Sequence, residues 1–351
     1  MIPATTEDVT AAWMAETLGL PITAIDAEPI GVGVGLLGDL LRVRLDYDGS
    51  RPAEAPESVI VKLPTHAPAN KAIGMALQFY EREVRFFQHV APSAELRIPR
   101  AWHAAMDVEA GRFVLVLEDL SHLELADQVA GMTVDQAKRA VAAIARFHAQ
   151  WWDTEALEAL DWLPTSDHPI TMQAATMYRD AWPAFVEKWG HVVPEGGLAV
   201  GERVRDVFDA MLVELARPPR TIVHTDFRLD NLFFGPDEVA VIDWQLTTRG
   251  GGAYDVAYLL AQSMSADLRR RHDEAVLRHW YDALGIASYG WEQAKEDYAT
   301  GVLLCLVIPV NAGAEIDLGN ERGEALVREI TERAFTAALD VDWQRVLDRF
   351  A

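Results

Sequence analysis

The stretch IVHTDFRLDNLFFGPDEVAVIDW, residues 222–244, decides how the whole chain is interpreted. It contains the pattern H-x-D-x-x-x-x-N, which includes Asp226 and Asn231, and a further aspartate, Asp243, follows twelve residues after the asparagine. Phosphoryl transfer needs a carboxylate that orients or deprotonates the attacking hydroxyl, together with hard oxygen ligands for Mg²⁺. Asp226 can supply the first, and Asn231 with Asp243 can supply the second.

A purely structural interpretation competes with this one. Aspartate and asparagine in short loops commonly bond to nearby backbone groups in turns, and for Asp226, Asp230 or Asn231 taken alone that interpretation is favoured. The complete spacing, with Asp243 directly after a second β-branched run, favours phosphoryl transfer. We interpret His224 as a structural histidine that hydrogen-bonds backbone behind the loop.

Two features nearer the N-terminus support a nucleotide site. The stretch GVGLLG, residues 33–38, contains Gly33, Gly35 and Gly38 and matches the pattern G-x-G-x-x-G. The residues after Gly38 alternate between apolar and charged, which predicts a strand. The loop therefore joins two strands, as a glycine-rich flap over phosphates does, whereas a dinucleotide-binding fingerprint would join a strand to a helix. Lys62 lies in the apolar run 59–63, where it either faces solvent or contacts phosphates.

A carboxylate partner for Lys62 is expected on the next element. Residues 71–90 are predicted to form one helix, in which Glu83 shares a face with Phe79 and Phe86. An unpaired carboxylate on a buried face is costly. Glu83 is therefore the natural partner of Lys62, and Glu81 is the competing choice.

Composition limits the partners. The chain has 351 residues with 31 Lys and Arg against 54 Asp and Glu, a net charge of −23. A field of that sign repels nucleic acid and anionic membrane surfaces, so neither is an expected partner. Cys305, the one cysteine, cannot form an intrachain disulfide. The N-terminus lacks a basic region followed by an apolar run, so we expect a cytoplasmic protein.

The order of patterns predicts an α+β fold with two lobes. Alternating strand patterns dominate residues 1–118, which are expected to form a small N-terminal lobe with an antiparallel sheet. Residues 119–351 are expected to form a larger helical C-terminal lobe that holds the catalytic loop, the acceptor pocket and a small strand pair within 221–243. Helices are expected at about 200–216, 254–284, 290–308 and 320–340.

These residues and spacings resemble the aminoglycoside phosphotransferase and choline kinase-like family, which has the protein-kinase-like fold. Within that family, the loop at 224–226 and the tripeptide at 243–245 are most similar to the ecdysteroid kinase-like branch. The resemblance spans the chain from the glycine loop to Asp255.

The resemblance implies a kinase that uses ATP and Mg²⁺ to phosphorylate a hydroxyl group of a small molecule, with ATP bound between the lobes. It implies Asp226 as the catalytic base, Asn231 and Asp243 as Mg²⁺ ligands, and Lys62, held by Glu83, on the phosphates. The adenine is expected against the hinge from Glu118 to Leu120, and the flap with Gly33, Gly35 and Gly38 over the phosphates.

The sequence does not identify the acceptor molecule. An aminoglycoside, a choline-like amine, a sugar and a lipophilic alcohol are all compatible with the residues. The resemblance implies neither a preference for ATP over GTP nor an oligomeric state. The alternative function is a nucleotide-binding, pseudokinase-like module without transfer. The intact set of Lys62, Asp226, Asn231 and Asp243 argues against it. Protein kinase activity ranks lowest, because Arg228 stands two residues after Asp226 in place of a lysine.

Overall fold

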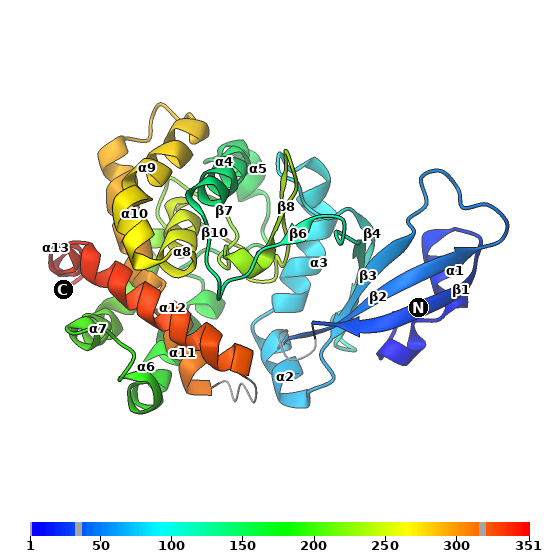
Figure 1. The fold of residues 1–351 in the computed structure, drawn as a ribbon, viewed down its shortest axis with the longest axis horizontal. Helices are drawn as coiled ribbons and strands as arrows, with labels where there is room; N and C mark the ends of the chain where they lie inside the picture. The colour runs from blue at the N-terminus through cyan, green and yellow to red at the C-terminus, as the bar shows by residue number, and fades with distance from the viewer. Residues whose placement is uncertain (1, 32–36, 316–320) are drawn as a thin grey trace. The chain divides into compact units, whose positions relative to one another are not determined.

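The computed structural model describes residues 2–31, 37–315 and 321–351, and these form the mixed α+β architecture predicted from the sequence (Figure 1). The chain divides into two compact units. The first consists of Met1–Ala94, Ile98–Glu124 and Ile242–Leu246, and the second of Glu95–Arg97, Leu125–Val241 and Thr247–Ala351. The short segment Ile242–Leu246, which carries Asp243, therefore packs with the N-terminal residues.

The first unit is built on a five-stranded sheet in the order β1-β2-β3-β5-β4, and the neighbouring strands within it are antiparallel. This confirms the predicted N-terminal antiparallel sheet. Its strands are β1 (Ile22–Ile30), β2 (Gly38–Tyr47), β3 (Ser58–Pro64), β4 (Ala101–Asp107) and β5 (Arg112–Glu118).

Successive side chains of a strand point to opposite faces of a sheet, and β3 shows what each face does. Val59 and Val61 are fully buried in a core cluster that includes residues packed from α1 (Ala11–Leu18). Lys62 lies between Val61 and Leu63 in sequence and so points to the other face. The alternation of side chains along β3 thus separates a packing face from a face that carries a charge.

The predicted single helix at 71–90 is two helices. The chain forms α2 (Pro68–Ala76) and α3 (Phe79–His89), with Leu77 and Gln78 between them. Gln78 has φ +55°, a left-handed conformation that ends one helix and lets the next begin in a new direction. Glu83 lies on α3, where its side chain is buried.

The second unit is mainly helical and contains two small sheets. β7 (Thr221–Val223) pairs with β10 (Thr248–Gly250), and a three-stranded sheet has the order β6-β8-β9. Its strands are β6 (Glu124–Leu125), β8 (Leu232–Phe234) and β9 (Val239–Val241). The longer helices are α4 (Val134–Trp151), α6 (Pro169–Trp189), α7 (Gly197–Leu215), α8 (Ala253–Ser263), α9 (Ala266–Leu284), α10 (Trp291–Leu304), α11 (Val307–Glu315) and α12 (Glu321–Asp340), and the short ones are α5 (Glu155–Glu158) and α13 (Trp343–Asp348).

Two predicted helices of this unit are interrupted. The predicted helix at 254–284 is α8 and α9, separated at Met264 and Ser265, and the one at 290–308 is α10 and α11. All eleven residues of α8 are buried. A helix that is buried on all sides shows no amphipathic stripe that would mark its end.

The stretch Trp291–Ala314, which spans α10 and α11, is long and apolar enough in composition to cross a membrane. Of its most apolar window, however, 78% is buried inside the protein. Core helices pass the same compositional test, and the burial here is what a core helix shows. Cys305, between the two helices, is fully buried, and burial raises the pKa of its thiol.

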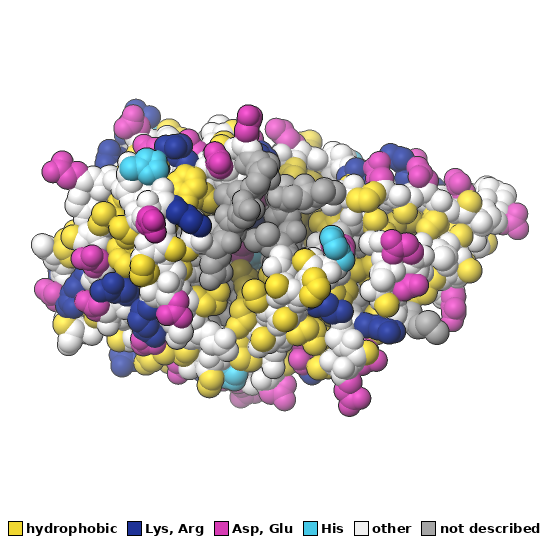
Figure 2. Space-filling view, turned by 90° about the horizontal axis from the view of Figure 1, so that it is seen from below, with side chains coloured by type: hydrophobic (Ala, Val, Ile, Leu, Met, Phe, Trp, Pro, Cys, Tyr) yellow, Lys and Arg dark blue, Asp and Glu magenta, His cyan; other side chains and the backbone are white. Residues whose placement is uncertain are grey.

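The described surface carries few large apolar side chains. Those that are well exposed are Ile73, Val108, Leu125 and Val213, which lie far apart in the sequence. Figure 2 shows acidic side chains scattered over the visible face among basic and uncharged ones. The surplus of negative charge is thus spread over the surface rather than gathered in one patch on this face.

We predict that Gly201→Ala destabilises the second unit. A Cβ at Gly201 of α7 would lie 2.1 Å from the ring of Trp182 on α6, and Trp182 belongs to a cluster of buried aromatic side chains. Overpacking of this kind costs about 1–3 kcal/mol. Urea unfolding measures the loss. The matched control is Gly290→Ser at the N-cap of α10, where a Cβ meets no atom within 4 Å; equal destabilisation by both variants would contradict the packing argument.

Candidate functional site

Lys62 is held in the first unit by two carboxylates. Its Nζ lies 2.8 Å from the carboxylate of Glu83 on α3 and 2.9 Å from Oδ1 of Asp243. Glu81, the competing choice, instead pairs with Arg85 one turn further along α3 at 2.8 Å. The structure therefore brings together Lys62, Glu83 and Asp243, which are far apart in the sequence.

The net charge of this group depends on the protonation of Glu83. Although burial opposes the charge of Lys62, Asp243 and Glu83 hold the pKa of its ammonium above the usual value. Burial raises the pKa of Glu83 to about 7 against the opposing effect of Lys62. One ammonium faces two carboxylates, so the group carries a net charge of −1 when both are ionised and is neutral when Glu83 is protonated; with a Glu83 pKa of about 7, both states are populated near neutral pH. The side chain of Asp243 is 25% exposed, against 1% for Glu83, so Asp243 is the carboxylate that a further cation can reach.

Gly38, the last glycine of the predicted flap, lies against Lys62. A Cβ at this position would come within 3.1 Å of Lys62 Cε and 3.3 Å of the Leu63 carbonyl oxygen. A side chain at position 38 would therefore press on the lysine. Gly33 and Gly35 lie outside the described residues.

The segment Ile242–Leu246 is fixed to α3 by packing. The ring of Trp244 is fully buried and stacks on Phe86, with ring centroids 4.1 Å apart and an interplanar angle of 8°. Arg82, also buried on α3, donates to the Leu246 carbonyl at 3.2 Å. Phe86 follows Glu83 by three residues, so it lies on the same side of the helix. Trp244, to which the sequence assigned no role, thus aligns Asp243 with the helix that carries Glu83.

The proposed catalytic loop of the second unit surrounds Asp226 with donors. Tyr258 of α8 donates its hydroxyl to Oδ1 at 2.8 Å, and Asn231 donates its amide to Oδ2 at 2.9 Å. Arg228 Nε lies 3.3 Å from Oδ1, while its Nη1 donates to Asp230 at 2.9 Å. The structure therefore brings Asp226 and Asn231 together, and it gives Asp230 a structural role through Arg228.

The loop backbone is held by Asp255. Its carboxylate accepts from the backbone N–H of His224 at 2.8 Å and of Thr225 at 2.9 Å, and it is fully buried. Thr225 has φ +71°, a costly conformation for a β-branched residue. Asp255, in the first turn of α8, thus compensates the strain of a loop that lies before it in sequence.

A histidine behind Asp255 completes this arrangement. The indole N–H of Trp280 donates to Nδ1 of His148 at 3.2 Å, and His148 Nε2 lies 3.2 Å from Asp255. Because an indole nitrogen only donates, Nδ1 must accept and Nε2 must carry the proton. His148 therefore donates to the carboxylate, a contact that no sequence pattern indicated. His224 acts as expected: its Nδ1 accepts from the backbone N–H of Asp226 at 3.2 Å.

Asn231 and Asp243 each carry an oxygen of the kind that a hard divalent cation binds. Asn231 uses its amide nitrogen toward Asp226, which turns its amide oxygen to the other side. Amide and carboxylate oxygens are among the ligands that Mg²⁺ takes from proteins when phosphates and waters supply the rest. Among the residues that the structure describes, three or more His, Cys, Asp or Glu side chains do not gather at a metal-binding distance.

The hinge residues are fixed in the first unit. The Glu118 carboxylate accepts from the backbone N–H of Arg100 at 3.0 Å, and Asp119 accepts from Ser58 at 2.7 Å and from Arg42 at 3.0 Å. Although burial opposes it, the donors around Asp119 hold the pKa of its carboxyl below the usual value. Leu120 is buried, so the hinge side chains are set before any ligand arrives.

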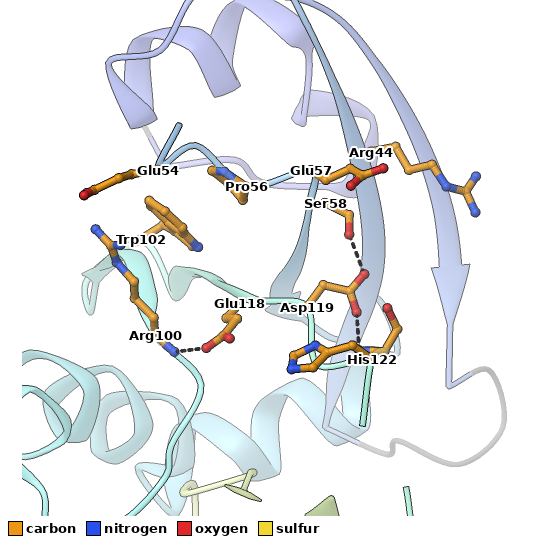
Figure 3. A pocket seen from close by; sticks show the side chains of 11 residues that line it. Arg44, Glu54, Pro56, Glu57, Ser58, Arg100, Trp102, Glu118, Asp119 and His122 are labelled. Carbon is orange, nitrogen blue, oxygen red and sulfur yellow. Dashed lines mark hydrogen bonds between the residues drawn. The ribbon is translucent and has the colours of Figure 1, made fainter. Parts of the chain in front are cut away.

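A cavity of about 570 Å³ lies at this end of the sheet (Figure 3). Glu118 and Asp119 form one wall, and Arg100 stacks over the ring of Trp102 at 3.8 Å on another. Glu54 and Glu57, from the segment before β3, close the opposite side. Lys62, Glu83 and Asp243 are not among the residues that line this cavity.

Solved phosphotransferase structures have a similar fold. A spectinomycin phosphotransferase in complex with ADP and spectinomycin is 12% identical, the match covers 94% of this chain and 98% of that chain, and the TM-score is 0.55. An ethanolamine kinase of Plasmodium vivax is 12% identical over 86% of this chain and 80% of that chain, with a TM-score of 0.51. At these identities the likeness shows the fold alone.

Sequence comparison is more specific. The model of the ecdysteroid kinase-like family matches residues 33–287, which include every predicted site residue. A mouse protein named acyl-CoA dehydrogenase family member 10 is 33% identical over 100 residues, or 26% of this chain. The chain spans only 9% of the length of that curated relative.

We predict that Asp255→Asn destabilises the protein by about 2–4 kcal/mol, because an amide cannot accept from both backbone donors and from His148 in a buried site. Urea unfolding followed by fluorescence measures the change. Asp180→Asn, an exposed change on α6, is the control and should leave the midpoint unaltered. Wild-type stability of Asp255→Asn would show that the loop is held by other contacts.

Proposed function

Because the chain belongs to the ecdysteroid kinase-like family, we propose that it transfers the γ-phosphoryl group of ATP to a hydroxyl group of a small molecule. The family is one of kinase-like phosphotransferases. The observation that carries the finer proposal is the state of Asp226: its carboxylate receives hydrogen bonds from Tyr258 and Asn231 and is fixed at the start of a strained loop. A preorganised carboxylate is what the orientation of an attacking hydroxyl requires.

ATP is the proposed donor nucleotide. The Lys62 ammonium, clamped between Glu83 and Asp243, is suited to contact phosphate oxygens, and Gly38 leaves room beside it. The hinge from Glu118 to Leu120 is proposed to meet the adenine. A related fold has been solved with ADP, which supports a nucleotide as ligand.

Mg²⁺ is proposed to accompany ATP, with Asn231 and Asp243 as its protein ligands. When bound, the ion would neutralise charge that develops on the transferring group. The surplus negative charge around Lys62 supports a cation at Asp243. This local arrangement explains how a protein with a net charge of −23 could take an anionic nucleotide.

The residues divide the chemistry between them. Asp226 accepts a hydrogen bond from the acceptor hydroxyl, orients its oxygen toward the γ-phosphorus and takes its proton as the bond to phosphorus forms. The bond between the γ-phosphorus and the oxygen that bridges it to the β-phosphate breaks in the same step, and ADP leaves. Lys62 stays protonated throughout, because the two carboxylates raise its pKa. It therefore offsets phosphate charge and does not transfer a proton.

The acceptor is proposed to be a small hydroxylated molecule, because a spectinomycin phosphotransferase and an ethanolamine kinase have similar folds. The tryptophans of the helical unit do not narrow the choice: Trp182 and Trp280 are buried in packing contacts. A screen of amines, aminoglycosides, sugars and lipophilic alcohols by ADP formation is the direct way to find the acceptor.

We predict that Asp226→Asn lowers turnover by about 10²–10⁴-fold, the usual contribution of a positioned general base. The measurement is ADP formation with the acceptor found by the screen. Asp237→Asn, an exposed change in the turn between β8 and β9, is the control and should turn over as the wild type does. Full activity of Asp226→Asn would remove the proposed base.

We predict that Asp243→Asn weakens binding of Mg·ATP by roughly tenfold, or ~1.4 kcal/mol, because the cation loses a charged ligand and Lys62 loses a partner. Titration calorimetry with Mg·ATP measures the affinity. Asp46→Asn, an exposed change on β2, is the control. Equal affinities of the Asp243 and Asp46 variants would contradict the metal assignment.

Retained Mg·ATP binding by the wild type without ADP formation from any acceptor would favour the pseudokinase-like alternative.

A further inference from the structure

We infer that Tyr258 is a positioning residue of the reaction, which orients the Asp226 carboxylate toward the acceptor hydroxyl. The inference rests on the proposed function and deepens it. It begins from a contact that neither the sequence motif nor the family match assigns: the hydroxyl of Tyr258, on α8, donates to Oδ1 of Asp226 at 2.8 Å.

The two shortest hydrogen bonds to Asp226 reach different oxygens, while Arg228 Nε lies between them at 3.3 Å from Oδ1 and 3.4 Å from Oδ2. Tyr258 bonds Oδ1, and the amide of Asn231 bonds Oδ2 at 2.9 Å. The terminal torsion of an aspartate is broad, so a carboxylate with a donor on one oxygen alone can rotate. Two donors from different elements fix that rotation. Removing Tyr258 would leave Oδ1 with only the longer contact to Arg228, at 3.3 Å.

Tyr258 is itself held rigidly. It is fully buried, and every residue of α8 is buried around it. It follows Asp255 by three residues, so the two side chains leave the helix on the same side. Asp255 holds the loop backbone at His224 and Thr225, while Tyr258 holds the side chain of the next residue. One helix thus sets both the position and the rotation of the proposed base.

The hydroxyl acts as a donor and not as a base. Burial, reinforced by the charge of Asp226, raises the pKa of Tyr258 well above its usual value. Tyr258 therefore keeps its proton while Asp226 accepts one from the acceptor. A simple packing role is the competing explanation, because buried tyrosine hydroxyls usually find a partner.

The chain offers a matched comparison. Tyr254 lies one turn before Tyr258 on α8 and is also buried, but its hydroxyl interacts with Cys305. Tyr254→Phe and Tyr258→Phe thus remove the same atom from the same helix, and only the second removes a hydrogen bond to Asp226. The full-length variants are compared per folded molecule, with the folded fraction taken from thermal melting.

The assay is phosphate release from Mg·ATP with water in the acceptor's place, repeated with the acceptor once a screen provides it. We expect Tyr258→Phe to lower kcat about tenfold, with KM for ATP changed by less than about twofold, because a misaligned base affects the transition state more than nucleotide binding. Tyr254→Phe should keep both values. Equal kcat values for the two Phe variants would overturn the inference.

A double variant tests whether Tyr258 acts through Asp226. Adding Tyr258→Phe to Asp226→Asn should cause no further loss of kcat, because residues that act as a unit are not additive. A further loss of about tenfold would show an independent effect and overturn the inference. Wild-type kcat in Asp226→Asn would instead overturn the proposed function, and the inference with it. A large loss in Asp226→Asn beside an unaltered Tyr258→Phe overturns the inference alone.

Discussion

The buried carboxylate of Asp255 is the constraint on which the second unit's loop depends. Thr225 adopts a left-handed conformation that a β-branched residue avoids, and the loop keeps it because Asp255 accepts the backbone N–H groups of His224 and Thr225. His148, whose tautomer is set by Trp280, holds the carboxylate from behind. Three donors thus satisfy the buried carboxylate of Asp255. Because this carboxylate fixes the backbone at His224 and Thr225, it also fixes the direction in which the next side chain, that of Asp226, leaves the backbone.

The same helix reaches the far end of the loop. Ser263, the last residue of α8, donates its hydroxyl to the side-chain oxygen of Gln128, and that oxygen also accepts from the backbone N–H of Leu229. α8 therefore contacts the loop directly at its beginning and through Gln128 near its end. A helix that is buried throughout can position both ends because its own side chains have little freedom to move.

The sequence predicted what depends on local patterns. The spacing of Asp226, Asn231 and Asp243, the alternation of β2 and the apolar run of β3 each lie within a few dozen residues, and the resemblance that implied the kinase-like fold rests on them. Contacts between distant residues could not be predicted. Lys62 and Asp243 are 181 positions apart, and no periodicity indicates that Tyr258 meets Asp226 or that Trp244 stacks on Phe86. The helix breaks at Gln78 and after α8 were missed because apolar residues continue across them.

The first unit is discontinuous, and this affects how the chain can fold during synthesis. Residues up to Glu124 leave the ribosome long before Ile242–Leu246 is made. Until then Phe86 lacks the ring that covers it, and Lys62 lacks one of its two counter-charges. The nascent N-terminal unit therefore stays incompletely packed until this segment has been synthesised, more than a hundred residues later. Contacts between residues so far apart in the sequence form late and slow folding.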